Sequence, residues 1–146
     1  MVAAARDRTL ARPTYSLHPV HAALLAGTMP LFLGALLSDW AYATSYEIQW
    51  KNFASWLIVG GLVFGGFTLL FALVGWIRAG RRGRRPMLYF LVLLAAWVLG
   101  FINALVHAKD AWASMPDGLI LSAITALLVI AAMALGFPRW RTGAVR

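Results

Sequence analysis

The sequence predicts an all-α integral membrane protein, built as one bundle of four transmembrane helices. Three observations lead to this fold class. The 146-residue chain is 62% hydrophobic and only 12% charged, whereas soluble globular domains carry about 25% charged residues. Its apolar residues are gathered into four long stretches. The charged residues lie in short clusters between these stretches, which argues against the nucleic-acid binding that a net charge of +8 alone would suggest.

Each apolar stretch approaches the length needed to cross a bilayer. A hydrocarbon core requires about 20 apolar residues in helical conformation, and only a helix satisfies the backbone of a single such segment in lipid. The predicted helices cover about residues 19–40, 53–76, 87–107 and 119–137. Together they form a predicted transmembrane domain over residues 18–137, between a basic head, 1–17, and a basic tail, 138–146.

The basic residues are distributed unevenly over the two sides of this bundle. Eleven of the 13 Lys and Arg residues fall in the head, the middle connector and the tail, which share one side, and the other side has only Lys51 and Lys109. Because short basic loops stay cytoplasmic, we expect both termini to lie in the cytoplasm. The middle connector contains a cluster that we expect to contact lipid headgroups, namely Arg81, Arg82, Arg84 and Arg85.

The first predicted helix carries a titratable group at each end of one face. At 100° per residue, one stripe contains His21, Leu25, Thr28, Phe32, Ala35 and Asp39. We expect this stripe to face protein. His18, near the N-cap, and His21 form a candidate ligand site on the cytoplasmic side. Either imidazole could bind a metal, a quinone carbonyl or a lipid phosphate, or could serve only in capping and interfacial anchoring.

Small residues on the second and third helices predict close helix packing. Gly61 and Gly65 form a G-x-x-x-G spacing, which lets another helix approach closely. This spacing is compatible with packing inside the monomer or with a homo-oligomer seam. One face of the third helix is lined by Ala96, Gly100, Asn103 and His107. Asn103 on this face needs a hydrogen-bond partner in lipid.

A second candidate site lies on the predicted outer side. Asp39 ends the first helix, and Asn103, His107 and Asp110 end the third. His107 and Asp110 are three residues apart, so both side chains can reach one point. One imidazole and two carboxylates could bind a divalent cation, pass protons or dock a partner. The alternative is a solvated helix end with a His–Asp hydrogen bond.

The sequence contains no recognisable catalytic set and requires no cofactor. The chain has no cysteine, which excludes thiol chemistry and iron–sulfur ligation. A b-type haem held by two histidines needs both ligands at one depth, but His18 and His21 begin the first helix and His107 ends the third. Since these helices run in the same direction, roughly 30 Å of bilayer separates the histidines. A haem would need a partner subunit, a dimer or an unusual ligand.

Three groups of motifs occur in a fixed order along the chain. They are Leu17-His18-Pro19-Val20-His21 with Asp39, then Asn52-Phe53-Ala54-Ser55-Trp56 with the glycine-rich run behind it, then Asn103 to Asp110 continuing to Gly118 and Ser122. With this pattern, residues 15–137 resemble an uncharacterised family of small bacterial four-helix membrane proteins, a domain of unknown function. The resemblance implies an association with periplasmic redox proteins, because some members are fused to Rieske-type iron–sulfur domains or encoded near sorbosone-type sugar dehydrogenases.

These features predict a small, non-catalytic inner-membrane protein that anchors or organises a periplasmic-facing redox partner. Its docking or ion site would be the end with Asp39, Asn103, His107 and Asp110. Two alternatives stay open. One is a b-type haem or quinone-linked electron-transfer subunit. The other is an ion- or proton-binding membrane protein that uses His107, Asp110 and Asp39.

Overall fold

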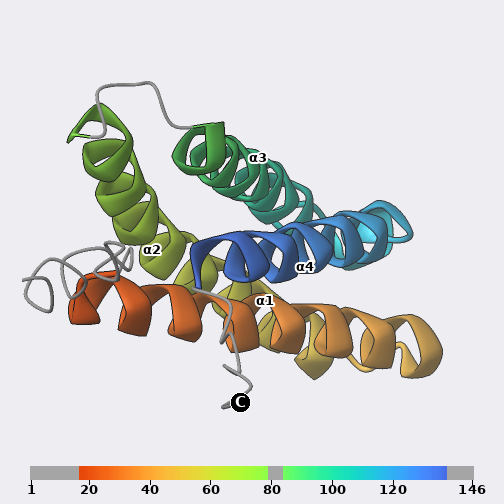
Figure 1. Ribbon diagram of the computed structural model, residues 1–146. Helices are drawn as coiled ribbons and strands as arrows, with labels where there is room; N and C mark the ends of the chain where they lie inside the picture. Colours follow the sequence, from red (N-terminus) through yellow and green to blue (C-terminus); the bar gives the residue numbers. More distant parts are fainter. Residues whose placement is uncertain (1–16, 79–83, 138–146) are drawn as a thin grey trace, which may run out of the picture.

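The computed structural model describes residues 17–78 and 84–137, and these residues fold into four long helices with no strand among them. The elements are α1 (Pro19–Ser45), α2 (Ile48–Arg78), α3 (Arg84–His107), the 3-10 turn η3 (Ala111–Ser114) and α4 (Asp117–Gly136) (Figure 1). All four α-helices are long and apolar enough to cross a membrane. The predicted all-α, four-helix membrane fold is therefore confirmed. The basic tail, Arg81, Arg82 and all of the basic head except Leu17 lie outside the described residues.

The helices form a ring in which each one packs against its neighbours in the chain, and α4 closes the ring onto α1. Consequently α1 and α3 lie diagonally across the bundle (Figure 1). Two side-chain pairs span this diagonal. His21 of α1 meets Tyr89 of α3, and Asp39 of α1 meets His107 of α3, each pair being 68 residues apart in sequence. Because the offset is the same in both pairs, α1 and α3 run in the same direction without a shift in register.

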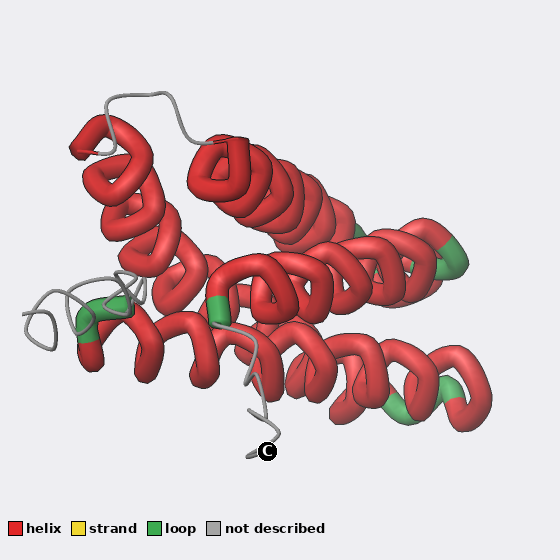
Figure 2. The backbone as a smooth tube through the Cα atoms, viewed as in Figure 1, coloured by secondary structure: helices red, strands yellow, loops and turns green. Residues whose placement is uncertain are grey.

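The first two helices are longer than the apolar stretches that predict them. α1 continues to Ser45, where Tyr46 ends it in a left-handed conformation with φ 58°. α2 then begins at Ile48, so the two helices are joined by a tight turn (Figure 2). The helix continues through the polar residues after Trp40, and the hydroxyls of Thr44 and Ser45 donate to the backbone carbonyls of Trp40 and Ala41.

The interior of the bundle is built on the predicted stripe of α1. All six residues of that stripe are buried, and so are Ala96, Gly100, Asn103 and His107 of α3. Phe32 fills the centre. A Cβ on Gly61 would lie 2.9 Å from its ring, and a Cβ on Gly100 would lie 3.0 Å from it. The glycines thus admit one aromatic ring between three helices.

The same contacts correct one alternative from the sequence. Gly61 packs against Phe32, and Gly65 faces Thr28 and Trp97 of the same chain. Both glycines are buried. The G-x-x-x-G spacing therefore serves packing inside the monomer, and a homo-oligomer seam through Gly61 and Gly65 is not available.

The outer surface of the bundle is apolar on every helix. Large side chains that are more than half exposed include Leu37, Trp56, Leu70, Leu105 and Leu127. Exposed apolar area of this extent is suited to contact with lipid tails, which require no polar groups on the surface they cover.

Candidate functional site

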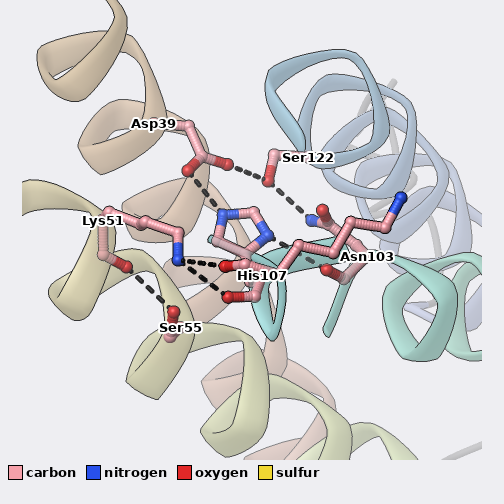
Figure 3. A network of polar contacts seen from close by, with 7 residues as sticks. Asp39, Lys51, Ser55, Asn103, His107 and Ser122 are labelled. Atoms are coloured by element: carbon pink, nitrogen blue, oxygen red, sulfur yellow. Dashed lines mark hydrogen bonds and ion pairs between the residues drawn. The ribbon is translucent and has the colours of Figure 1, made fainter. Parts of the chain in front are cut away.

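Four polar side chains from three helices meet inside one end of the bundle (Figure 3). We refer to Asp39 of α1, Asn103 and His107 of α3 and Ser122 of α4 as the Asp39 cluster. Asp39 and Asn103 are fully buried, Ser122 is 1% exposed and His107 is 4% exposed. Polar groups at such depth in a membrane bundle are costly unless they are hydrogen-bonded to one another.

The cluster satisfies this requirement with a closed loop of contacts. Asp39 accepts at both carboxylate oxygens: Ser122 Oγ donates to Oδ2 at 2.5 Å, and His107 Nε2 lies 2.8 Å from Oδ1. Asn103 Nδ2 donates to Ser122 Oγ at 2.7 Å. The loop closes where His107 Nδ1 lies 3.0 Å from the backbone carbonyl oxygen of Asn103.

These contacts determine how many protons the pair holds. A carbonyl oxygen only accepts, so His107 Nδ1 carries a proton. Ser122 accepts from Asn103 and uses its own proton toward Asp39. A second proton must then lie between His107 Nε2 and Asp39 Oδ1, on one atom or the other. The Asp39–His107 pair is therefore neutral as a whole and contains one proton that the two side chains share.

A glycine makes room for the imidazole. Gly118 lies in the first turn of α4, and a Cβ there would be 2.8 Å from His107 Cε1. The absence of a side chain lets α4 approach α3 closely enough for Ser122 to reach both Asp39 and Asn103. Gly118 thus positions the cluster although it contributes no polar atom.

A buried lysine lies beside the cluster at the end of α3 (Figure 3). Lys51, only 8% exposed, donates from Nζ to the backbone oxygens of His107 at 3.0 Å and Lys109 at 2.9 Å. It therefore supplies donors for carbonyls that a helix C-terminus leaves unpaired. Its charge is placed where the helix dipole favours a cation.

The cluster also contains an acceptor that no hydrogen bond uses. Among the described residues, Oδ1 of Asn103 is buried without a hydrogen-bond partner. The same is true of Oγ1 of Thr125, which lies about one turn after Ser122 on α4. The described residues contain no group of three or more His, Cys, Asp or Glu able to hold a metal ion. A cation bound here would therefore need the oxygens of Ser122 and Asn103 besides Asp39 and His107.

The predicted outer-side site is only partly assembled as expected. Asp39, Asn103 and His107 come together, but Asp110 is exposed and takes no part. α3 ends at His107, so the helical spacing that would bring Asp110 back to the imidazole no longer applies. Of the alternative, a solvated helix end with a His–Asp hydrogen bond, the structure has the hydrogen bond, between His107 and Asp39, but the pair is buried rather than solvated.

Two residues at this end of the bundle could not be identified as site residues from the sequence alone. Ser122 and Lys51 reach the site only through the folded arrangement of α2, α3 and α4. Weak signals exist for both. Ser122 and Thr125 are the only polar groups within the apolar stretch of the fourth helix, and Lys51 is one of two basic residues on its side of the bundle.

The predicted site at His18 and His21 lies at the opposite end of α1. His18 caps the helix by accepting from the Val20 N–H at 3.3 Å, and His21 Nε2 lies 2.8 Å from the Tyr89 hydroxyl. Both imidazoles stack on Phe71, with ring centroids 6.2 and 5.5 Å away. These side chains line a cleft of about 350 Å³.

Two arginines of the predicted headgroup cluster lie within the described residues. Arg84 is exposed. Arg85, also exposed, donates from its guanidinium to the backbone oxygens of Leu135 and Phe137, at 3.2 and 3.4 Å. It therefore caps the end of α4, besides any contact with headgroups.

Comparison with known proteins gives two matches. Residues 17–141 match a family described as "Predicted membrane protein (DUF2231)". The chain is also similar to a Saccharophagus degradans protein named "Putative manganese efflux pump MntP", with 34% identity over 92 residues, which are 61% of this chain and 48% of that protein. The chain thus spans about half the length of this curated relative. No solved structure matches the chain.

Proposed function

Because the chain belongs to the DUF2231 family of predicted membrane proteins, its activity has to be inferred from its own site, and we propose that it binds a divalent cation of the Mn²⁺ class at the Asp39 cluster in exchange for a proton. One observation carries this proposal. A carboxylate oxygen and an imidazole nitrogen lie 2.8 Å apart in the interior of a membrane bundle. Ionisable groups at such positions commonly belong to ion or proton sites.

The exchange replaces one proton with one divalent cation. In its resting form the Asp39–His107 pair is neutral and holds one shared proton. A cation that binds Asp39 Oδ1 and His107 Nε2 takes the place of this proton, which leaves the site. Because one proton leaves for each divalent cation, the site gains one positive charge, and the proton on His107 Nδ1 stays on the Asn103 carbonyl.

The donor atoms favour a hard or borderline cation. The cluster offers a carboxylate, a hydroxyl and the unpartnered amide oxygen of Asn103, together with one imidazole. Oxygen-rich sets suit Mn²⁺, Mg²⁺ and Ca²⁺, whereas thiolates select softer ions. This chain has no cysteine. The similarity to a protein named as a manganese efflux pump agrees with the same class of cation.

Burial favours an internal ion site over the other two hypotheses. A docking surface for a redox partner needs exposed groups, but Asp39, Asn103 and His107 are covered by the bundle. A haem held by two histidines needs a second histidine at the depth of His107, but His18 and His21 lie at the opposite end of the bundle. The redox association rests on the family resemblance alone.

The proposal covers binding rather than a complete pump. The chain matches only about half of its curated relative. The bundle interior around Phe32 and Val129 is filled, with both side chains at most 2% exposed. In the orientation predicted from the basic residues, the Asp39 cluster lies toward the outer face of the membrane.

Thermal unfolding with and without MnCl₂ tests the proposal. The variants are Asp39→Asn, which keeps the shape of the side chain, and Asp110→Asn as a control for an exposed acid at the same end. At a concentration one hundred times the dissociation constant, a bound ion stabilises the fold by about 2.7 kcal/mol. We expect Mn²⁺ to raise the unfolding midpoint of the wild type and Asp110→Asn but not of Asp39→Asn. An equal increase in all three proteins would refute the proposal.

A further inference from the structure

A second binding site is suggested by the cleft at the end of the bundle opposite the Asp39 cluster. The cleft lies between the start of α1, the end of α2 and the start of α3, and its volume is about 350 Å³. Polar lining comes from His18, His21, Arg78 and Tyr89, and apolar lining includes Phe71 and Val74. A cleft with both kinds of lining is suited to a ligand with a polar head and an apolar tail.

The charge at this end favours an anionic head. Arg78 ends α2 and is exposed beside the cleft. All carboxylates of the described residues lie at the opposite end of the bundle: Asp39, Glu47, Asp110 and Asp117. The N-terminus of α1 also lies at this end, where the helix dipole favours negative charge. No described carboxylate therefore competes with an anion for Arg78.

The depth of the lining residues fits a phospholipid. Arg78 and His18 are at helix ends, where a transmembrane helix meets the headgroup region. Phe71 lies seven residues before Arg78 on α2, which is about 10 Å deeper along the helix. Phe71 and Val74 are 37% and 49% exposed, so they continue the cleft as an apolar surface toward the lipid tails.

The aromatic contacts keep the polar wall in place. His18 and His21 both stack on Phe71, and Nε2 of His21 also lies within hydrogen-bond distance of the Tyr89 hydroxyl. His21 is 6% exposed. Few rotamers therefore need to be fixed when a ligand binds, which lowers the entropy cost of recognition.

We propose that this cleft binds one anionic phospholipid, with its phosphate at Arg78 and His18 and an acyl chain along Phe71 and Val74. The site is separate from the Asp39 cluster. His21 and Asp39 are 18 residues apart on α1, a distance of about 27 Å. The lipid would therefore bind whether or not a cation occupies the other end.

Titration of the detergent-solubilised protein with short-chain dihexanoyl phosphatidylglycerol tests the proposal. Dihexanoyl phosphatidylcholine and inorganic phosphate serve as reference ligands. Arg78→Gln removes the charge at the cleft, and Arg84→Gln removes an exposed charge at the same end that does not line the cleft. We expect Arg78→Gln to weaken phosphatidylglycerol binding about fivefold, and Arg84→Gln to leave it unchanged.

A second variant tests the volume of the cleft rather than its charge. Gly75 lines the cleft, and Gly75→Leu would fill part of it, so we expect this variant to lose the lipid while it elutes as a folded protein. Three results would overturn the proposal: equal weakening by Arg84→Gln, equally tight binding of phosphatidylcholine, or equally tight binding of inorganic phosphate. The first would indicate diffuse surface charge, the second a cleft with no preference for a negative headgroup, and the third a site to which the acyl chains contribute nothing.

Discussion

The two ends of α1 use the same diagonal contact with α3 in different surroundings. At one end Asp39 meets His107 inside the bundle, and at the other His21 meets Tyr89 beside an open cleft. The first pair is joined by Ser122 and Asn103 into a closed network, whereas the second borders on a space that a ligand could enter. The comparison shows that one helix-to-helix register can support an internal ion site at one end and an open binding site at the other.

Removal of the acid should have the largest effect and separate the two ends most clearly. Asp39→Ala leaves buried donors of both His107 and Ser122 without an acceptor, so the free energy of unfolding should fall by about 3–5 kcal/mol. Tyr89→Phe at the open end should lower it by only about 1 kcal/mol. Denaturant titration in detergent micelles measures both. Asp110→Ala is the control, and a comparable loss in this exposed position would show that burial is not the cause.

The close approach of α4 to His107 gives the second prediction. In Gly118→Ala the new methyl group would lie 2.8 Å from the imidazole, and overpacking of this kind costs about 1–3 kcal/mol. Gly65→Ala is the matched control, because its Cβ would lie 3.6 Å from the nearest atom, an ordinary contact. We expect a lower thermal midpoint only for Gly118→Ala. Equal destabilisation would mean that loss of glycine itself, rather than the contact with His107, is responsible.

The two cationic helix caps provide a smaller contrast. Lys51 caps α3 from a buried position beside the Asp39 cluster, and Arg85 caps α4 from an exposed position at the other end. Lys51→Met should cost about 1–3 kcal/mol because buried carbonyls lose their donors. Arg85→Met should cost less than about 1 kcal/mol because water can replace the guanidinium. The same denaturant titration compares them, and the reverse order would contradict the assigned burial.

Periodicity and composition were sufficient to predict the fold and one face of the site. Every residue of the α1 stripe from His21 to Asp39 is buried as predicted, because the titratable groups at its two ends find hydrogen-bond partners only inside the protein. The resemblance to an uncharacterised four-helix membrane family is confirmed by the match over residues 17–141. The side of the membrane on which the termini lie stays a prediction.

The remaining features depend on contacts between helices that the sequence pattern does not specify. Asp110 is near His107 in sequence, yet the end of α3 turns it away, while Ser122, 83 residues from Asp39, donates to the carboxylate. Lys51 looked like a connector residue but lies in the first turns of α2 and caps α3. For Asp110 and Lys51 the position of a helix end decided the outcome, whereas Ser122 reaches the site through the close packing of α4 against α3.

The central claim is that the proton shared by Asp39 and His107 leaves when a divalent cation binds. Proton release on addition of MnCl₂ to weakly buffered, detergent-solubilised protein measures this directly with a pH-sensitive dye, with Asp39→Asn as the reference. We predict about one proton released per Mn²⁺ bound by the wild type, and none from Asp39→Asn. Mn²⁺ binding without proton release, or equal release from both proteins, would contradict the exchange at this pair.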